Sequence, residues 1–320
     1  MGKFFESAQQ FDGKSGGFAR RLEGKPPYIG LRKGITMPDF SDILLTVDYD
    51  RTLTAPDSSI PERNLEAIRY FMDHGGAFTV NTGRSVPMAG AFMDKVPVNV
   101  PLLLYNGSGA FDPNTRELSL LYEIPLDQGK TIRECLALFP DLTVEIQGIQ
   151  AHYRFTENPG WDAFSAHNNC PHAAAEPEDD LGPFLKFSIY GDFHDVTVAS
   201  MFDSTPEEAA RMDEAEKLLK ERYGESVEVF RAATRIIDVH AKGVSKIRAA
   251  RDLQKTLGRK WLVCVGDAEN DVSMLKGADF AFCPCDGIVA DRFPNVCACA
   301  EGAVAEVIYE KIPEILKRNP

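Results

Sequence analysis

The sequence predicts an α/β protein built on a doubly wound parallel sheet that is interrupted by an inserted α+β domain. Between residues 42 and 112, near-continuous apolar runs alternate with segments of helical period, and the same alternation returns after residue 236. An unbroken apolar run is typical of a strand that is covered on both faces, as the strands of parallel sheets are. The residues in between combine several strand-like runs with two helical segments, which is typical of an α+β domain.

The first part of the core is expected to follow the order strand, helix, strand, helix, strand. The helix that begins at Pro61 carries apolar residues at helical spacing, and Gly75-Gly76 ends it as a C-cap pair. This order implies parallel strands with helices outside the sheet. The five elements are Ile43–Val47, the helix from Pro61, Ala77–Val80, Met88–Lys95 and Pro101–Tyr105.

The insert and the returning part of the core are defined by further elements of both kinds. In the insert we expect strands at Leu118–Tyr122, Leu142–Ile146, Ala151–Phe155, Phe184–Tyr190 and Val227–Arg231, helices at Asp127–Leu138 and Pro206–Arg222, and a long loop at Glu157–Asp180. The core returns from Ile236 with Ser245–Leu257, Trp261–Val265, Asp271–Lys276, Phe280–Cys283 and Ala303–Leu316. We therefore assign residues 41–113 and 236–320 to the core, 114–235 to the insert and 1–40 to an N-terminal extension.

Composition narrows the class of protein. The 320 residues are 44% hydrophobic and 26% charged, which suits a globular protein of two domains, and the net charge of −13 argues against a nucleic-acid-binding surface. No apolar run reaches the roughly 18 residues that a membrane span needs, and the start has no signal-peptide core, so we expect a cytoplasmic protein. Seven cysteines favour reduced core thiols, because the C-x-C spacing at Cys283 and Cys297 is not the usual zinc spacing.

Two acidic segments follow two of the apolar strands. Asp48 and Asp50 come directly after Ile43–Val47, and Asp267 and Asp271 follow Trp261–Val265. The carboxyl ends of parallel strands share one edge of the sheet, so these side chains are expected to meet there. Several carboxylates in one site need a cation to offset their repulsion, and Mg²⁺ prefers such oxygen ligands. Because Asp48 and Asp50 are two residues apart, a continuing strand would turn both to the same side, where one can attack while the other transfers protons.

Other segments are candidates for binding phosphate. Thr82 and Gly83 lie in the turn after Ala77–Val80, where a hydroxyl and backbone N–H groups can hold phosphate oxygens; a helix N-cap is the structural alternative for Thr82. Lys246 begins a helix and would neutralise charge on a phosphoryl group, with Lys242 as the rival candidate. Asn270 and Asp271 could instead cap the helix that follows them. Capping does not account for Asp267, which lies before that helix.

Taken in this order, the segments resemble the motifs of the haloacid dehalogenase (HAD) superfamily, and most closely those of its Cof-type (type IIB) phosphatases. The resemblance covers residues 42–112 and 236–310. The four matching segments are Asp48-Tyr49-Asp50-Arg51-Thr52, Thr82-Gly83-Arg84, Lys246 and Gly266–Asp271. The resemblance implies a Rossmann-like, HAD-like core with the insert as a cap domain.

The resemblance also implies a chemistry: Mg²⁺-dependent hydrolysis of a phosphomonoester through an aspartyl-phosphate. It makes Asp48 the nucleophile and Asp50 the general acid/base. Mg²⁺ would be held by the Asp48 side chain, the Asp50 backbone carbonyl and Asp267, with Asp271 behind them. The residues implied to bind the phosphoryl group and substrate are Thr82, Gly83, Arg84, Asn106, Lys246 and Asn270. The sequence departs from the family at Arg51, where Gly is usual and would give the turn more backbone freedom.

The insert is expected to choose the substrate, and a sugar phosphate or a similar small phosphorylated metabolite is the default. The residues that would line its entrance, unless they only decorate a surface loop, are His152, Tyr153, Trp161, His167, Asn168, Asn169 and His172. Three alternatives stay open: phosphoryl transfer between hydroxyls, as in a mutase, a non-catalytic phosphate-binding module, and carbon–halogen cleavage. The presence of both Asp50 and Asp267 in the metal-site pattern favours phosphate chemistry over carbon–halogen cleavage. The sequence leaves the oligomeric state unknown.

Overall fold

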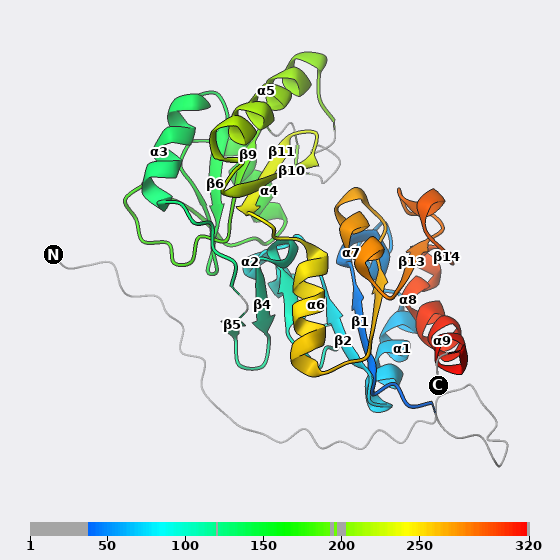
Figure 1. The fold of residues 1–320 in the computed structure, drawn as a ribbon. Helices are drawn as coiled ribbons and strands as arrows, with labels where there is room; N and C mark the ends of the chain where they lie inside the picture. The colour runs from blue at the N-terminus through cyan, green and yellow to red at the C-terminus, as the bar shows by residue number, and fades with distance from the viewer. Residues whose placement is uncertain (1–37, 120, 193–194, 197–202, 319–320) are drawn as a thin grey trace, which may run out of the picture. The chain divides into compact units, whose positions relative to one another are not determined.

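The computed structural model describes residues 38–119, 121–192, 195–196 and 203–318 (Figure 1). The predicted N-terminal extension of residues 1–40 therefore lies almost wholly outside the described residues. All seven cysteines are free thiols. Among the described residues, none of the helices is both long and apolar enough to cross a membrane.

A parallel five-stranded sheet forms the core, in the order β14-β13-β12-β1-β2. Its strands are β1 (Ile43–Val47), β2 (Ala77–Val80), β12 (Trp261–Val265), β13 (Phe280–Pro284) and β14 (Asn295–Val296). Each neighbouring pair is parallel, and β1 lies in register between β2 and β12, two strands that are far apart in the sequence. The predicted α/β fold with a parallel sheet is confirmed.

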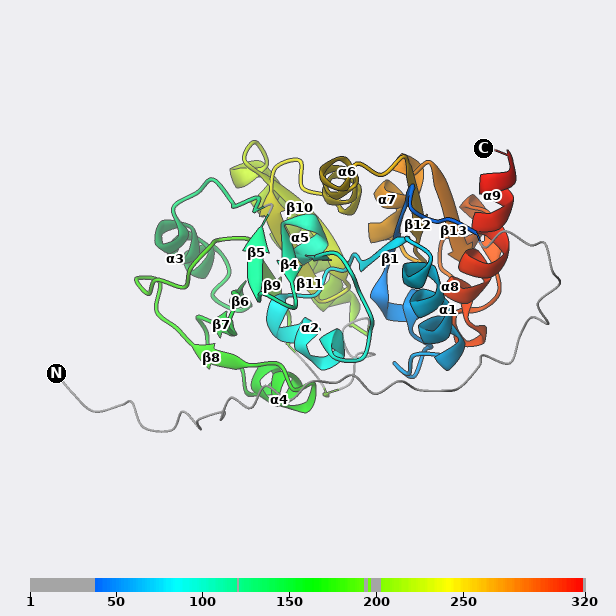
Figure 2. The ribbon, with the colours of Figure 1, turned by 90° about the horizontal axis from the view of Figure 1, so that it is seen from below.

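Helices cover both faces of this sheet because the strands are apolar on both sides. Leu45 and Val47 pack with α1 (Glu62–Asp73) and α8 (Ala303–Glu306), whereas Leu44 packs with α6 and α7 on the opposite face. Figure 2 shows α6 and α7 on one side of the sheet and α1 on the other. The remaining helical segments of the core are η1 (Tyr49–Leu53), α2 (Val86–Met93), η2 (Tyr105–Gly107), η4 (Glu269–Asp271), η5 (Ala290–Arg292), η6 (Cys299–Glu301), η7 (Val307–Lys311) and α9 (Ile312–Arg318), with α6 at Lys246–Leu257 and α7 at Val272–Gly277.

The third strand of the predicted parallel order is placed differently. β3 (Leu102–Leu104) pairs antiparallel with β4 (Gly109–Asp112), which pairs with β5 (Glu117–Ser119) in a separate three-stranded sheet. A parallel bridge between Asn81 and Leu103 joins β3 to the end of β2, so the predicted parallel direction beside β2 holds there, and what differs is the hairpin that follows. The chain turns back after β3 because residues 105–107 adopt positive φ angles, so the apolar run that predicted a parallel strand forms one side of a hairpin.

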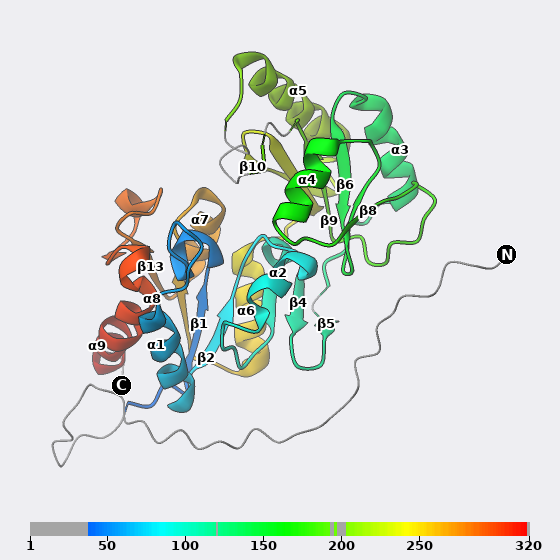
Figure 3. The ribbon, with the colours of Figure 1, turned by 180° about the vertical axis from the view of Figure 1, so that it is seen from behind.

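The second large sheet has six strands in the order β10-β11-β9-β6-β7-β8. These are β6 (Thr143–Gln147), β7 (His152–Arg154), β8 (His172–Ala174), β9 (Lys186–Tyr190), β10 (Val227–Ala233) and β11 (Ile236–Ala241). Helices α3 (Gln128–Leu138) and α5 (Pro206–Tyr223) cover one face, and α4 (Pro159–His167) packs on the other (Figures 1 and 3).

Two details of this sheet differ from the sequence analysis. β11 was assigned to the returning core, but it pairs with β9 and β10, so the second sheet continues to Ala241. The segment Glu157–Asp180 was expected to be loop, yet it contains α4 and β8. The sheet that a strand such as β11 joins depends on its pairing partners, and short elements in polar sequence, such as α4 and β8, acquire their structure from the neighbours against which they pack. The division into a core and an inserted cap remains a prediction, with its second boundary better drawn after Ala241.

Candidate active site

Three carboxylates lie together at the carboxyl ends of the central strands. The side-chain oxygens of Asp48, Asp267 and Asp271 come within 4.8 Å of one another, and all three residues are buried. The in-register pairing of Val47 with Val265 places the residues after β1 and β12 side by side. The structure thus brings the two acidic segments to one point, although they are remote in the sequence.

Lys246 is the cation at the centre of this cluster. It is the first residue of α6, and its Nζ lies 2.6 Å from Asp48 Oδ1 and 2.6 Å from Asp271 Oδ1. Only 1% of the residue is exposed, so the ammonium group is shielded from water. The rival candidate, Lys242, is itself exposed and instead lies 3.4 Å from the partly buried Glu228. Of the two lysines, the one that helix α6 directs inward belongs to the site.

Burial and the neighbouring charges raise the pKa values of Asp48 and Asp267. Burial raises the pKa of Asp48 well above its usual value, and the nearby Asp271 and Asp267 add to this effect, while Lys246 opposes it. Burial and Asp271 raise the pKa of Asp267 to about 6. Burial lowers the pKa of Lys246, but Asp271 and Asp48 outweigh it, so the lysine stays charged. Three buried carboxylates facing one ammonium therefore leave an excess of negative charge that a divalent cation would offset.

Neighbouring groups hold the carboxylates in place. The Thr52 hydroxyl donates to Asp267 Oδ1 at 2.9 Å, and Asp271 Oδ2 accepts from the backbone N–H groups of Asp267 and Ala268. A side chain at Gly266 would place its Cβ 2.6 Å from the Cβ of Asp271, so this position needs glycine. Asp271 uses both carboxyl oxygens in hydrogen bonds within the protein, whereas Asp48 and Asp267 are each bonded through Oδ1. The latter two are thus the better metal ligands.

Asp50 does not join this cluster. The strand does not continue after Asp48 as predicted. In η1, Asp50 is still extended (φ −75°, ψ 125°), but Arg51 is left-handed (φ 59°) and the Leu53 N–H donates back to the Asp48 carbonyl, so the two-residue spacing does not bring the two carboxylates together. Asp50 is half exposed and pairs with Arg84 through two hydrogen bonds, Nε to Oδ2 at 3.0 Å and a terminal nitrogen to Oδ1 at 2.7 Å. Arg84 also lies over the Tyr49 ring, which stacks on Phe92. In this arrangement Asp50 is held beside the cluster by Arg84.

The turn after β2 is built around Thr82 and Gly83. The buried Thr82 hydroxyl accepts from the Arg84 backbone N–H at 3.2 Å, and the Thr82 carbonyl accepts from Asn106 N–H at 3.0 Å. A Cβ on Gly83 would lie 2.8 Å from Asn106 Oδ1, so glycine lets this amide approach the turn. The structure therefore brings Thr82, Gly83, Arg84 and Asn106 together, whereas Asn270 lies exposed on η4.

The residues predicted to line the entrance from the insert are dispersed. His152 is buried and its Nε2 lies 2.7 Å from the Ser85 hydroxyl, and Trp161 is buried in α4 with His172 against its ring. His167, Asn168 and Asn169 are exposed at the end of α4. Sequence reasoning missed Lys186, whose ammonium lies 3.4 Å from the Gly83 carbonyl. The signal for it was the strict polar–apolar alternation of Lys186–Tyr190, which predicts that the polar residues share one face.

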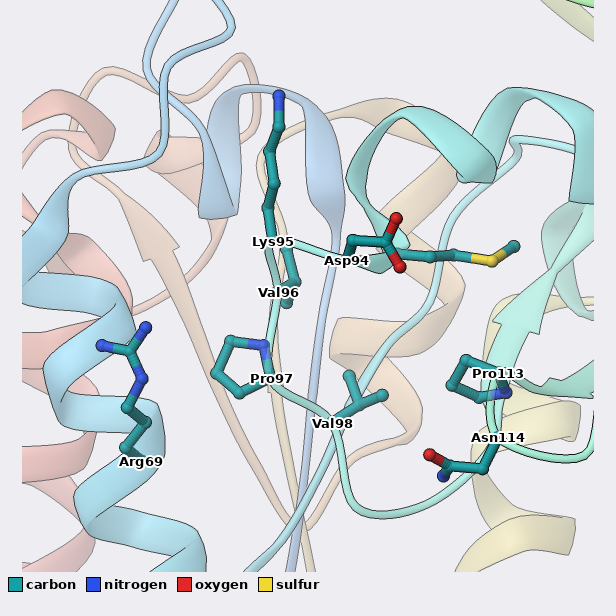
Figure 4. A pocket seen from close by; sticks show the side chains of 9 residues that line it. Arg69, Asp94, Lys95, Val96, Pro97, Val98, Pro113 and Asn114 are labelled. Carbon is teal, nitrogen blue, oxygen red and sulfur yellow. The ribbon is translucent and has the colours of Figure 1, made fainter. Parts of the chain in front are cut away.

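Two open cavities lie apart from these residues. One of about 340 Å³ is lined by α1, the connection between α2 and β3, and the residues after β4, and Figure 4 shows Arg69, Lys95 and Asn114 around it. The other, of about 330 Å³, lies at the start of α5 and includes Arg211 and Arg235. Neither is lined by a residue that the sequence analysis selected.

The comparisons with known proteins bear on the same residues. A family model described as haloacid dehalogenase-like hydrolase matches residues 45–286. Among solved structures, a haloacid dehalogenase-like hydrolase from Bacteroides thetaiotaomicron is 20% identical with a TM-score of 0.68, covering 84% of this chain and 98% of its own. A protein of Thermotoga maritima is 20% identical with a TM-score of 0.65, covering 83% and 96%. A HAD subclass IIB sugar phosphatase is 17% identical with a TM-score of 0.66, covering 85% and 99%. These three structures share the fold of this chain.

Proposed function

Since the chain belongs to the haloacid dehalogenase-like hydrolases, we propose that it is a Mg²⁺-dependent phosphomonoester hydrolase acting on a small phosphorylated metabolite. The predicted superfamily and its Cof-type phosphatase group are confirmed, and the chain is an enzyme of this class. The observation that carries the proposal is the buried cluster of Asp48, Asp267 and Lys246 at the sheet edge. A sugar phosphate is the favoured substrate, because a sugar phosphatase is among the proteins of the same fold.

The residues of the cluster fit a magnesium ion. Carboxylate oxygens are the ligands that Mg²⁺ prefers, and Asp48 and Asp267 would offer them, with the Asp50 backbone carbonyl as the further ligand that the resemblance implies. Burial raises the pKa of Asp267 and the charge of Asp271 adds to this, and a cation in the cluster would offset both effects. When bound, Mg²⁺ would supply positive charge for the phosphoryl oxygens and for the carboxylates.

The protein residues would carry out two displacements at phosphorus. In the first, an Asp48 oxygen forms a bond to phosphorus in line with the ester oxygen, that ester bond breaks, and Asp50 gives its proton to the departing alcohol. In the second, Asp50 takes a proton from water, the water oxygen bonds to phosphorus, and the acyl-phosphate bond of Asp48 breaks. Lys246 with Thr82 holds the phosphoryl oxygens.

The substitution Asp48→Asn tests the proposal directly. It removes the attacking oxygen with almost no change in shape, so Mg²⁺-dependent phosphate release from phenyl phosphate should fall by at least about 1,000-fold. Asp50→Asn should instead slow the second displacement, and acid-quenched protein should then carry the added mass of one phosphoryl group. Circular dichroism checks that both variants are folded, and EDTA should abolish wild-type turnover. A fully active Asp48→Asn variant would exclude the aspartyl-phosphate route.

A further inference from the structure

The six-stranded sheet has one apolar face and one polar face, and both are buried. In β9 and β11, Phe187 and Val239 point into the core under α3 and α5, while their neighbours point the other way. The polar face is formed by Glu145, Gln147, Lys186, Ser188, Asp238 and His240, none more than 4% exposed. Burying so many polar groups costs free energy that an apolar face would save. Stability therefore does not account for this face.

The polar face meets the turn that the proposed function assigns to the phosphoryl group. The Lys186 ammonium lies 3.4 Å from the Gly83 carbonyl, and the Asn106 amide lies 3.3 Å from His240 Nε2. Lys186 is paired with Asp238 at 2.6 Å, so its charge is already neutralised. The alcohol part of a phosphate ester whose phosphoryl group is bound at this turn would therefore face the polar side of the sheet.

Hydrogen-bond geometry leaves the carbonyl of Gln147 free. The hydroxyl of Ser188 donates to Asp238 at 2.7 Å, and that of Tyr190 donates to Glu145 at 2.9 Å. Each hydroxyl has a single hydrogen, so toward Gln147 both can only accept. The amide must therefore turn its NH₂ group to them, at 3.3 and 2.9 Å. This fixes the orientation of the amide, and within the described part of the chain its Oε1 is buried without a partner.

The other unsatisfied atoms nearby are acceptors as well. Among the described residues, Glu145 Oε2 and Asn106 Oδ1 are buried without a hydrogen-bond partner. The cations of the face are already paired, Lys186 with Asp238 and His152 with Glu145. Burial lowers the pKa of His152, but Glu145 outweighs this and raises it to about 9, and the His152 Nδ1 lies 3.3 Å from Glu145 Oε1. The face thus offers several free acceptors and no unpaired positive charge.

We propose that this polar face binds the alcohol half of the substrate, and that Gln147, Glu145 and Asn106 select an uncharged, polyhydroxylated leaving group over an anionic one. The inference rests on the proposed function and adds a substrate class to it. Hydroxyl groups of the substrate supply the donors that the free acceptors need. The third N–H of Lys186 can donate a hydrogen bond to one hydroxyl oxygen. A second anion would instead lie against Glu145 and Asp238 without an unpaired cation.

Three esters test the selection: sorbitol 6-phosphate, 6-phosphogluconate and phenyl phosphate. The first two differ only in a terminal carboxylate, and the third has no hydroxyl group. The wild type should hydrolyse sorbitol 6-phosphate with a kcat/KM at least about tenfold above that for 6-phosphogluconate. Gln147→Met keeps the side-chain size but removes the acceptor, so kcat/KM for sorbitol 6-phosphate should fall about 10- to 100-fold, with at most a twofold change for phenyl phosphate.

Ser188→Ala is the matched control. Ser188 belongs to the same network but has no unsatisfied atom, so its loss should affect sorbitol 6-phosphate and phenyl phosphate in the same proportion. The inference is overturned if the wild type prefers 6-phosphogluconate, or if Gln147→Met changes the two esters equally. A wild type that hydrolyses none of the three esters, phenyl phosphate included, contradicts the proposed function itself and removes the basis of the inference.

Discussion

At position 51 the backbone adopts the left-handed conformation, with φ of 59° and ψ of 12°. The resemblance to the HAD superfamily had indicated glycine here, and the structure supplies the reason, because only glycine enters this region without strain from a Cβ atom. Arg51 nevertheless fits, since its side chain is exposed and its backbone N–H donates to the Thr54 hydroxyl at 3.2 Å. Arg51 in place of glycine thus adds backbone strain at this position but leaves the turn itself intact.

Replacing Arg51 by glycine should therefore stabilise the protein. Removing the Cβ strain should raise the free energy of unfolding by about 1 kcal/mol, measured by urea denaturation. Arg51→Ala is the control, because it also removes the charge but keeps the Cβ, and it should give no such gain. Equal stabilities of the two variants would mean that residue 51 is not strained.

The pairing of Asp50 with Arg84 shows a limit of residue-level prediction. A spacing of two residues places side chains on one side only while the chain remains extended. The strand ends at Asp48 in a turn with a left-handed residue at Arg51, and Asp50 pairs with Arg84, which the resemblance had assigned to the phosphate. The roles of Asp50, Arg84 and Asn270 in catalysis or binding stay predictions.

At the scale of the elements, the hairpin turn after β3 controls where α6 begins. Gly107 has a φ of +97°, and a Cβ there would lie 2.5 Å from the carbonyl oxygen of Ser245, the N-cap residue of α6. Lys246 follows immediately, so this close approach of two backbones positions the cation of the site. The antiparallel β3–β4 hairpin, which the sequence analysis did not expect, is thus part of how the site is built.

Gly107→Ala should destabilise the protein by about 3 kcal/mol, since it adds both the left-handed strain and a clash with backbone that cannot move cheaply. It should also reduce phosphate release, because the start of α6 shifts with Ser245. Gly182→Ala is the matched control: its φ is +81°, but nothing lies within 4 Å of the added Cβ. That variant should lose only about 1 kcal/mol. Similar losses for both, from thermal or urea unfolding, would contradict the close approach.

At the scale of the whole molecule, folding joins acidic groups from both ends of the chain, and this has a consequence for stability. Burial raises the pKa of Asp267 from 3.8 to about 6, so the folded chain holds this proton more tightly than the unfolded chain. The contribution of Asp267 to the free energy of unfolding is therefore highest below about pH 4 and falls as the pH rises toward 6, by about 3 kcal/mol in total.

Metal-free wild type should accordingly lose stability relative to Asp267→Asn as the pH rises from 4 to 7, because asparagine does not ionise. The measurement is the difference in melting temperature between the two proteins in EDTA across this range. Adding Mg²⁺ at pH 7 should raise the melting temperature of the wild type and have little effect on Asp267→Asn. A difference that is independent of pH would show that Asp267 is not in a charge-rich, buried cluster.

The sequence by itself determined the α/β class, the strands that carry Asp48 and Asp267, and the family, because hydrophobic period and motif order are local properties of the chain. Only the tertiary structure decided that β3 turns back, that β11 joins the second sheet, and that Lys246 rather than Lys242 enters the site. It also revealed the buried polar face around Gln147. These features depend on which remote segments pack together, and no local pattern encodes the burial, pairing and free hydrogen-bond acceptors that such packing creates.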